Sequence, residues 1–153
     1  MAKEHIKLIA DNRKALYEYF VEERFEAGMV LTGTEVKSLR LGRANLKDSY
    51  GRFKKDGLYI LQMHISPYPF AYYDNHDPLR PRKLLLHKQE LHKLYGKINE
   101  RGYSLIPLRL YFRDSKVKLE IALAKGKHKY DKRESIKQRE NKREMDRVRK
   151  EYK

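Results

Sequence analysis

Residues 106–123 read IPLRLYFRDSKVKLEIAL, and this segment decides the fold. Apolar side chains occupy every second position on both sides of Arg113-Asp114-Ser115: Ile106, Leu108, Leu110 and Phe112 before it, and Val117, Leu119, Ile121 and Leu123 after it. A period of two is typical of a strand with one buried face. The segment therefore predicts two antiparallel strands joined by a tight turn.

Further strands are predicted upstream of this hairpin. The odd positions from Tyr17 to Leu31 are apolar with one break at Glu23, which indicates a long half-buried strand. A second hairpin turns at Lys55-Asp56-Gly57, and the predicted apolar face of its second strand is Tyr59, Leu61, Met63 and Ile65. Leu84-Leu85-Leu86 indicates a short buried run. Five or more antiparallel strands predict a small closed or nearly closed barrel, because closure removes exposed sheet edges.

Two helices are predicted between these strands. The first has Thr34 as its N-cap and Glu35 in its first turn. Val36 and Leu39 form its inner face, and it ends at Gly42. The second begins near His87, with Glu90 in a partial capping box, and continues to Gly102 with an apolar face of Leu91, Leu94 and Ile98.

Residues 66–82 predict a long irregular loop. Four prolines forbid regular strand pairing there, and the loop carries aromatic and then cationic side chains, namely Tyr68, Phe70, Tyr72, Tyr73, Arg80 and Arg82, with Lys83 just after it. A long loop with this composition is a candidate binding surface.

Composition points to a polyanionic partner. The chain of 153 residues has a formal net charge of +15 and a pI near 9.9, and such a positive field attracts nucleic acid. No apolar run is long enough to span a membrane, and the N-terminus lacks the core of a signal peptide. Cysteine is absent, which excludes disulfides and thiolate catalysis and favours a cytoplasmic location.

The charge is concentrated near the C-terminus. Residues 125–153 hold 13 Lys and Arg against 6 Asp and Glu, while the other 124 residues hold 23 against 15. The few large apolar residues of this segment cannot form a membrane-surface helix or offset the entropy of ordering. We therefore predict two domains: an RNA-binding barrel over residues 1–129, and a basic tail over residues 130–153 that is disordered when free and helical on its partner.

Signatures of enzymes are missing from the sequence. There is no P-loop, no G-x-S-x-G and no H-E-x-x-H, and the six histidines are scattered, so neither a cofactor nor a metal site is predicted. Named RNA-binding modules are missing as well. From the residues alone, the chain is predicted to be an RNA-binding protein of the translation apparatus and not an enzyme.

A resemblance narrows this prediction. The blocks that carry it are Glu26-Ala27-Gly28, GTEVKSLR at residues 33–40, RKLLLH at residues 82–87, Ala124-Lys125-Gly126-Lys127 and Tyr130-Asp131-Lys132-Arg133. In this order they resemble the bacterial SsrA-binding protein family, also called small protein B. The likeness runs from about Asn12 to Arg133 and continues beyond it only as composition.

The resemblance implies a fold and a function. The fold would be mainly β, an OB-like antiparallel barrel of about six strands with about three helices. The protein would bind the tRNA-like domain of transfer-messenger RNA (tmRNA, or SsrA RNA) and deliver it to stalled ribosomes for trans-translation. Its partners would be tmRNA, the small ribosomal subunit and its 16S rRNA and, indirectly through tmRNA, elongation factor Tu and alanyl-tRNA synthetase.

The resemblance also implies roles for single residues. The tmRNA contacts would be Asn12, Glu26, Lys37, Arg40, Lys83, Leu85, Lys125, Lys127 and Lys129. The decoding centre of the ribosome would be contacted by Tyr130, Asp131, Lys132 and Arg133, and the mRNA channel by the tail through Val148. Leu85 has a second interpretation as an ordinary core residue. His128 stands where this family usually has Lys, and a neutral imidazole would weaken a phosphate contact there.

One alternative function stays open at this stage. A structural protein of the ribosome would also be small, basic and tailed. Such a protein would be present on all ribosomes in equal amount, whereas a rescue factor would be enriched on stalled ones.

Overall fold

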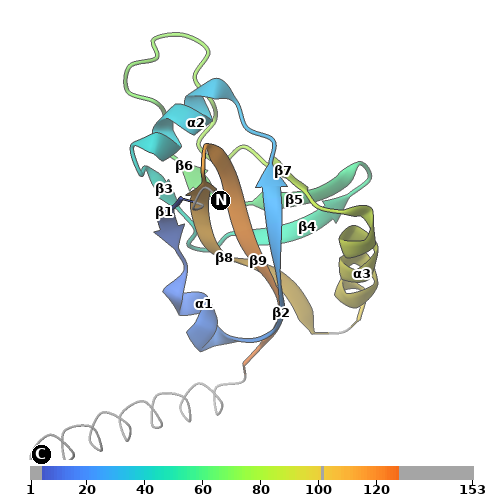
Figure 1. Cartoon of the computed structure of the whole chain (residues 1–153). Helices are drawn as coiled ribbons and strands as arrows, with labels where there is room; N and C mark the ends of the chain where they lie inside the picture. Colours follow the sequence, from blue (N-terminus) through green and yellow to red (C-terminus); the bar gives the residue numbers. More distant parts are fainter. Residues whose placement is uncertain (1–4, 101, 128–153) are drawn as a thin grey trace, which may run out of the picture.

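The computed structural model describes residues 5–100 and 102–127 of the chain (Figure 1). Its helices are α1 (Arg13–Glu18), α2 (Gly33–Arg40) and α3 (Lys88–Ile98). Its strands are β1 (Ile6–Asp11), β2 (Tyr19–Met29), β3 (Ala44–Asn45), β4 (Tyr50–Lys54), β5 (Gly57–Leu61), β6 (His64–Ile65), β7 (Arg82–Leu85), β8 (Tyr103–Arg113) and β9 (Lys116–Gly126).

Six of the strands close into a barrel. The pairing runs β8-β4-β5-β7-β2-β9 and returns to β8, because β9 pairs with both β2 and β8. Every pair is antiparallel, and β1 adds to the outer side of β8. In the described residues the fold is therefore a mainly β antiparallel barrel with three helices, as predicted.

The decisive hairpin of residues 106–123 is confirmed, with one change. β8 turns into β9 through Asp114, whose φ is +55°. The register between β8 and β9 shifts between Pro107 and Arg109, so the inward side of β8 changes along its length. Leu110 then faces the main core, whereas Ile106 and Leu108 pack under α1 in a smaller cluster with Ala15 and Ala122.

The predicted apolar face of the second hairpin was wrong over half its length. Leu58 and Ile60 are fully buried in β5, while Tyr59 and Leu61 are only half-buried. Met63 and Ile65 are buried as predicted. The phase changes at Gln62, which has a φ of +61° and interrupts the extended backbone between β5 and β6.

The helix boundaries also correct the predictions in part. The strand predicted from Tyr17 begins at Tyr19, because α1 occupies residues 13–18. Thr32, not Thr34, caps α2 and forms a capping box with Glu35. The capping box of His87 and Glu90 on α3 is confirmed, and Leu94 is its fully buried residue.

Glycine is required where the barrel closes. β4 and β8 are paired at a single position, Gly51 opposite Leu105. A Cβ atom on Gly51 would lie 2.8 Å from Leu105 Cβ, closer than packed atoms approach. The absence of a side chain at Gly51 therefore lets β4 and β8 meet.

Candidate nucleic-acid interface

Glu26 lies on the outer face of β2, in a cluster that reaches β8. The Arg113 Nη2 atom is 2.7 Å from Glu26 Oε2, and the Tyr111 hydroxyl donates to the same oxygen. Burial acts to raise the pKa of Glu26, but the hydrogen bonds from Tyr111 and Arg113 outweigh it, so the pKa lies below its usual value. Glu26 is therefore an anion that orients the guanidinium of Arg113.

A row of paired residues crosses four strands next to Glu26. Tyr111 pairs with Lys118, Lys118 with Gly28, and Gly28 with Leu85. The Leu85 side chain is 51% exposed, whereas its neighbour Leu84 is buried. Leu85 is thus not a core residue, and the interpretation of the Leu84-Leu85-Leu86 run as continuously buried was wrong.

The same face carries a second ionic cluster. Glu120 accepts from Arg109 at 2.8 Å and from Arg24 at 3.4 Å. Together with the Glu26 cluster these side chains line a shallow cavity of about 330 Å³. Arginines held in place by carboxylates can bind phosphates or base edges without first losing conformational entropy.

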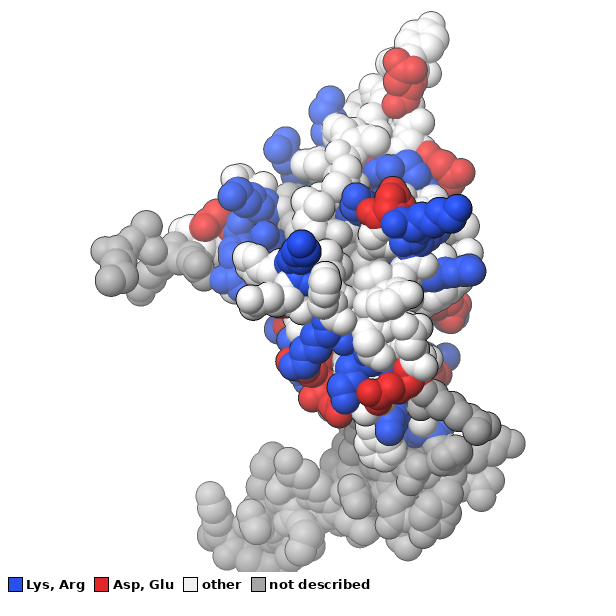
Figure 2. Space-filling view, turned by 90° about the vertical axis from the view of Figure 1, so that its right-hand side faces the viewer, with Lys and Arg blue, Asp and Glu red and all other residues white. Residues whose placement is uncertain are grey.

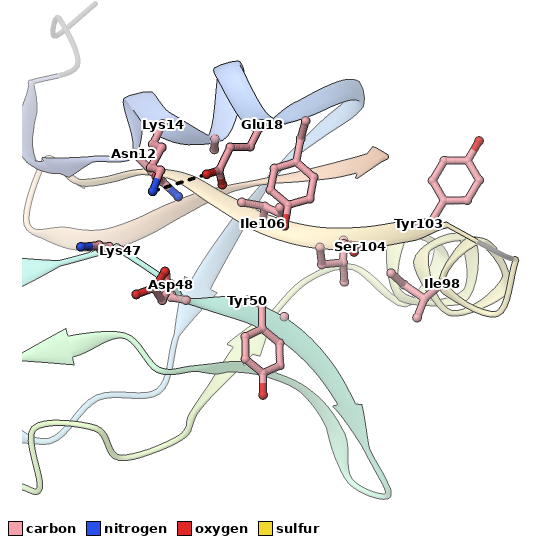
Figure 3. Close-up of a pocket in the computed structure, with 15 residues that line it drawn as sticks. Asn12, Lys14, Glu18, Lys47, Asp48, Tyr50, Ile98, Tyr103, Ser104 and Ile106 are labelled. Carbon is pink, nitrogen blue, oxygen red and sulfur yellow. Dashed lines mark ion pairs between the residues drawn. The ribbon is translucent and has the colours of Figure 1, made fainter. Parts of the chain in front are cut away.

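Asn12 lies in a larger cavity at the α1 end of the barrel. Its Nδ2 atom donates to the Pro107 carbonyl at 3.0 Å. Figure 3 shows Asn12, Lys14 and Glu18 on one side of this cavity of about 410 Å³, and Asp48 and Tyr50 on the other. The amide is thus fixed by the barrel with Lys14 beside it.

Lys125 and Lys127 leave the end of β9 against aromatic rings. Lys125 Nζ is 4.6 Å from the centre of the Tyr103 ring, and Lys127 Nζ is 4.9 Å from that of Phe20. Phe20 is 52% exposed, so cations and an open ring lie together beside α1. Such a combination suits a phosphate backbone with unstacked bases.

The other predicted cations lie elsewhere. Lys37 and Arg40 are exposed on α2, where Lys37 Nζ is 5.5 Å from the Tyr68 ring centre. Figure 1 places α2 at the end of the barrel opposite α1. Lys83 lies within β7, on the same outer face as Leu85. The predicted tmRNA residues in the described chain are therefore spread over both ends and one face of the barrel.

The loop between β6 and β7 corrects another prediction. Arg80 and Arg82 were predicted as cations of a binding surface. In the structure they form an internal ion cluster with Glu35. Arg82 has no exposed surface; it donates to Glu35, to the Met63 carbonyl and, at 3.1 Å, to that of Pro78. Both arginines anchor the loop to α2; Arg82 is inaccessible to RNA, whereas the Arg80 side chain is still 34% exposed.

The aromatic part of that loop is exposed, as a binding surface requires. Phe70, Tyr72 and Tyr73 are 70%, 92% and 87% exposed. The buried His76 ties the loop to the body through the Thr34 hydroxyl at 2.9 Å and the Ile65 carbonyl at 2.8 Å. The exposed aromatic residues therefore lie in a loop that His76 fixes to the body of the protein.

Several predicted site residues lie outside the described residues. These are Lys129, Tyr130, Asp131, Lys132, Arg133 and Val148. The domain boundary at residues 129 and 130 lies there as well and stays a prediction.

Sequence reasoning missed Lys118, Tyr111 and Arg113 as parts of the site. The only signal for them was their position on the polar side of the two last strands. Between residues 5 and 127, residue 101 excepted, no group of three His, Asp or Glu side chains could hold a metal ion. Over the same part of the chain, no helix is long and apolar enough to cross a membrane.

Comparison with known proteins identifies the family. The model of the SmpB protein family matches residues 9–151. The SsrA-binding protein of Symbiobacterium thermophilum is 58% identical over 96% of this chain and 94% of its own length, and that of Syntrophobacter fumaroxidans is 60% identical over 96% and 91%. A solved chain from "tmRNA-SmpB: a journey to the center of the bacterial ribosome" superposes with a TM-score of 0.66 at 43% identity, over 83% of this chain and 93% of that one. The chain belongs to the SmpB protein family.

Proposed function

We propose that this protein binds the tRNA-like domain of tmRNA and delivers it to stalled ribosomes for trans-translation. The observation that carries the proposal is the likeness, over nearly the whole chain, to relatives named SsrA-binding protein. The proposed activity is binding in the cytoplasm without a cofactor. Elongation factor Tu and alanyl-tRNA synthetase are indirect partners through the RNA.

The described surface supports an RNA ligand. Lys125 and Lys127 supply positive charge next to the half-buried ring of Tyr103 and the exposed ring of Phe20 at the α1 end, beside the fixed amide of Asn12. Leu85 on β7 offers an apolar contact, and Glu26 on β2 holds the guanidinium of Arg113 on β8. Lys37, Arg40 and Lys83 add positive charge farther along the barrel, and Lys129 continues the basic run of β9.

The tail has the second role in this proposal. Tyr130 stacks on a base in the decoding centre, where Asp131, Lys132 and Arg133 have fixed partners in the 16S rRNA. The remaining tail occupies the empty mRNA channel with Val148 as an apolar contact. The composition of residues 130–153, basic with few apolar side chains, suits an RNA-lined channel.

The test separates binding of tmRNA from its function on the stalled ribosome. Changing Asp131, Lys132 and Arg133 together to Ala alters the net charge by only one, so affinity for the tRNA-like domain is expected to fall less than about tenfold. Tagging by reconstituted stalled ribosomes is expected to be lost, because charge-assisted contacts are worth about 1.5–3 kcal/mol each. A parallel loss in the gel shift and the tagging assay would contradict the division between body and tail.

The structural ribosomal protein is the alternative that this proposal must exclude. Sequencing the RNA that co-purifies with the native protein is expected to give tmRNA in large excess over its cellular share. Recovery of ribosomal RNA alone, with equal occupancy of all ribosomes, would favour the alternative.

A further inference from the structure

A groove on the side of the barrel away from Asn12 has no part in the proposed function. It lies between α3 and the β4–β5 hairpin and has a volume of about 520 Å³, within the range of about 300–1,000 Å³ typical of ligand sites. Its lining consists of Phe53, Lys54, Lys55, Gly57, Lys88, Leu91, His92 and Tyr95. Figure 2 faces this side and shows uncharged surface bordered by many Lys and Arg side chains, with fewer Asp and Glu among them.

The floor of the groove is aromatic. The Phe53 and Tyr95 rings meet edge to face, with their centres 5.3 Å apart. Tyr95 is 56% exposed, so the ring is fixed by Phe53 but remains open to a ligand. A fixed and open aromatic ring is the surface on which unstacked nucleobases bind, and the stacking tolerates any base.

The rim of the groove is cationic. Lys54 and Lys55 come from the hairpin and Lys88 from the first turn of α3, so positive charge faces the floor from both sides. No carboxylate lines the groove. The nearest acid on the hairpin, Asp56, is engaged by the Tyr59 hydroxyl. Lys83 packs against Gly57 and continues the positive charge toward the outer face of β7.

We propose that this groove binds unpaired nucleotides of RNA, with a base stacked on Tyr95 and phosphates on Lys54, Lys55 and Lys88. The inference extends the proposed function and rests on it only for the choice of RNA over an acidic peptide. Charge complementarity supports RNA, because an aromatic floor between lysines matches a base between phosphates.

The experiment is a titration of the full-length protein, labelled with ¹⁵N, with hexaadenylate. The backbone amide signals of residues 53–57 and 88–95 are expected to shift and saturate. Tyr95→Ala is expected to weaken this binding about fivefold or more, whereas Tyr95→Phe keeps the ring and the affinity. The melting temperature of each variant shows that a loss of binding is not a loss of fold.

Matched charge variants separate the groove from the general positive field. Lys55→Gln/Lys88→Gln removes two positive charges at the groove, and Lys7→Gln/Lys116→Gln removes two exposed ones far from it. The first pair is expected to weaken hexaadenylate binding at least threefold more than the second. Equal weakening by both pairs, or unshifted groove signals, would overturn the inference.

Two further arms assign the ligand class and keep this inference distinct from the proposed function. Hexaglutamate is expected to leave the groove signals in place, and stronger binding of this peptide than of hexaadenylate would overturn the assignment to RNA. The tRNA-like domain is titrated separately: if the wild-type protein fails to bind it, the proposed function fails, whereas the groove inference depends only on the hexaadenylate result.

Discussion

At the scale of single residues, Glu35 combines burial with charge. It has no exposed surface, and its carboxylate accepts from Arg80 at 2.6 Å, from the Thr32 backbone N–H at 2.8 Å and from the equally buried Arg82. Through these bonds it joins α2 to β7 and to the loop that presents Phe70, Tyr72 and Tyr73. A single carboxylate thus anchors three segments of the chain.

Glu35→Gln is expected to lower the free energy of unfolding by about 3–5 kcal/mol. The amide can still cap α2, but the buried guanidinium of Arg82 loses its counter-charge. Chemical denaturation measures the loss. The matched control is Glu18→Gln, which breaks the exposed 3.4 Å pair with Lys14 and is expected to cost at most about 0.5 kcal/mol. Similar losses in the two variants would show that the internal ion cluster is not what stabilises the loop.

The same carboxylate predicts a pH dependence. Burial acts to raise the pKa of Glu35, but hydrogen bonds from Arg80, the Thr32 backbone and Arg82 outweigh it and hold the pKa below its usual 4.5. Because the unfolded chain then takes up the proton first, this stabilisation is present above pH 4.5 and disappears as pH falls through the lower folded pKa. The stability gap between wild type and Glu35→Gln is therefore expected to narrow below about pH 4.5. A difference in stability between the two proteins that stays constant from pH 7 to pH 3 would contradict this prediction.

The residues of β7 show what the sequence could and could not reveal. Alternation along Arg82-Lys83-Leu84-Leu85 places Arg82 and Leu84 inside and Lys83 and Leu85 outside. The sequence suggested that Arg82 is exposed and Leu85 is buried, because Arg is rarely fully buried and Leu usually belongs to the core. Only the position of Glu35 on α2, a contact across 47 residues, explains the buried Arg82.

At the scale of elements, the seam of the barrel with the fewest paired residues lies between β4 and β8, where Gly51 alone is paired. Gly51→Ala is expected to destabilise the protein by about 1–3 kcal/mol, because the new Cβ atom would overlap Leu105 Cβ. Gly96→Ala is the control: it lies within α3, a Cβ atom there meets nothing within 4 Å, and the change is expected to stabilise by about 0.4–1 kcal/mol. Thermal unfolding of both variants checks the opposite signs, and a neutral Gly51→Ala would show that the seam relaxes freely.

Elements with a sustained pattern could be predicted, and short ones could not. The β8–β9 hairpin and α3 have regular apolar spacing over eleven residues each, and both were found. α1 has six residues and a single buried side chain, Ala15, so it leaves no periodic pattern to detect. The phase change at Gln62 is invisible as well, since glutamine carries no signal for a positive φ.

At the scale of the whole molecule, the barrel of the described residues closes upstream of the predicted tail. The last buried side chain of the described chain is Ala124, and the barrel closes through β9. A protein ending at Lys129 is therefore expected to unfold cooperatively, with a melting temperature within a few degrees of the full chain, and to bind the tRNA-like domain. Circular dichroism and a gel shift check both expectations. Aggregation, or the loss of a thermal transition, would place the tail in the folded body.

The number of antiparallel strands predicted a closed barrel, but local patterns could not show which strands pair to close it. The two hairpins follow from neighbouring residues, but the pairing of β2 with β9 and β7 joins segments far apart in the chain. The family resemblance implied the closed fold, and the strand pairing confirms it. The placement of the tmRNA contacts stays a prediction, because RNA recognition depends on a partner whose shape the sequence does not describe.

The order of the strands also affects how each copy of the protein is made. β8 and β9 are synthesised after the other strands of the described barrel, yet β8 pairs with β1 and β4, and β9 with β2. A nascent chain that stops before Lys116 leaves β2 and β8 with unpaired edges, which favour aggregation over folding. A chain made from an interrupted message for this protein is therefore expected not to close the barrel. A protein proposed to relieve ribosomes halted on broken messages is thus expected to fold only when its own message is intact.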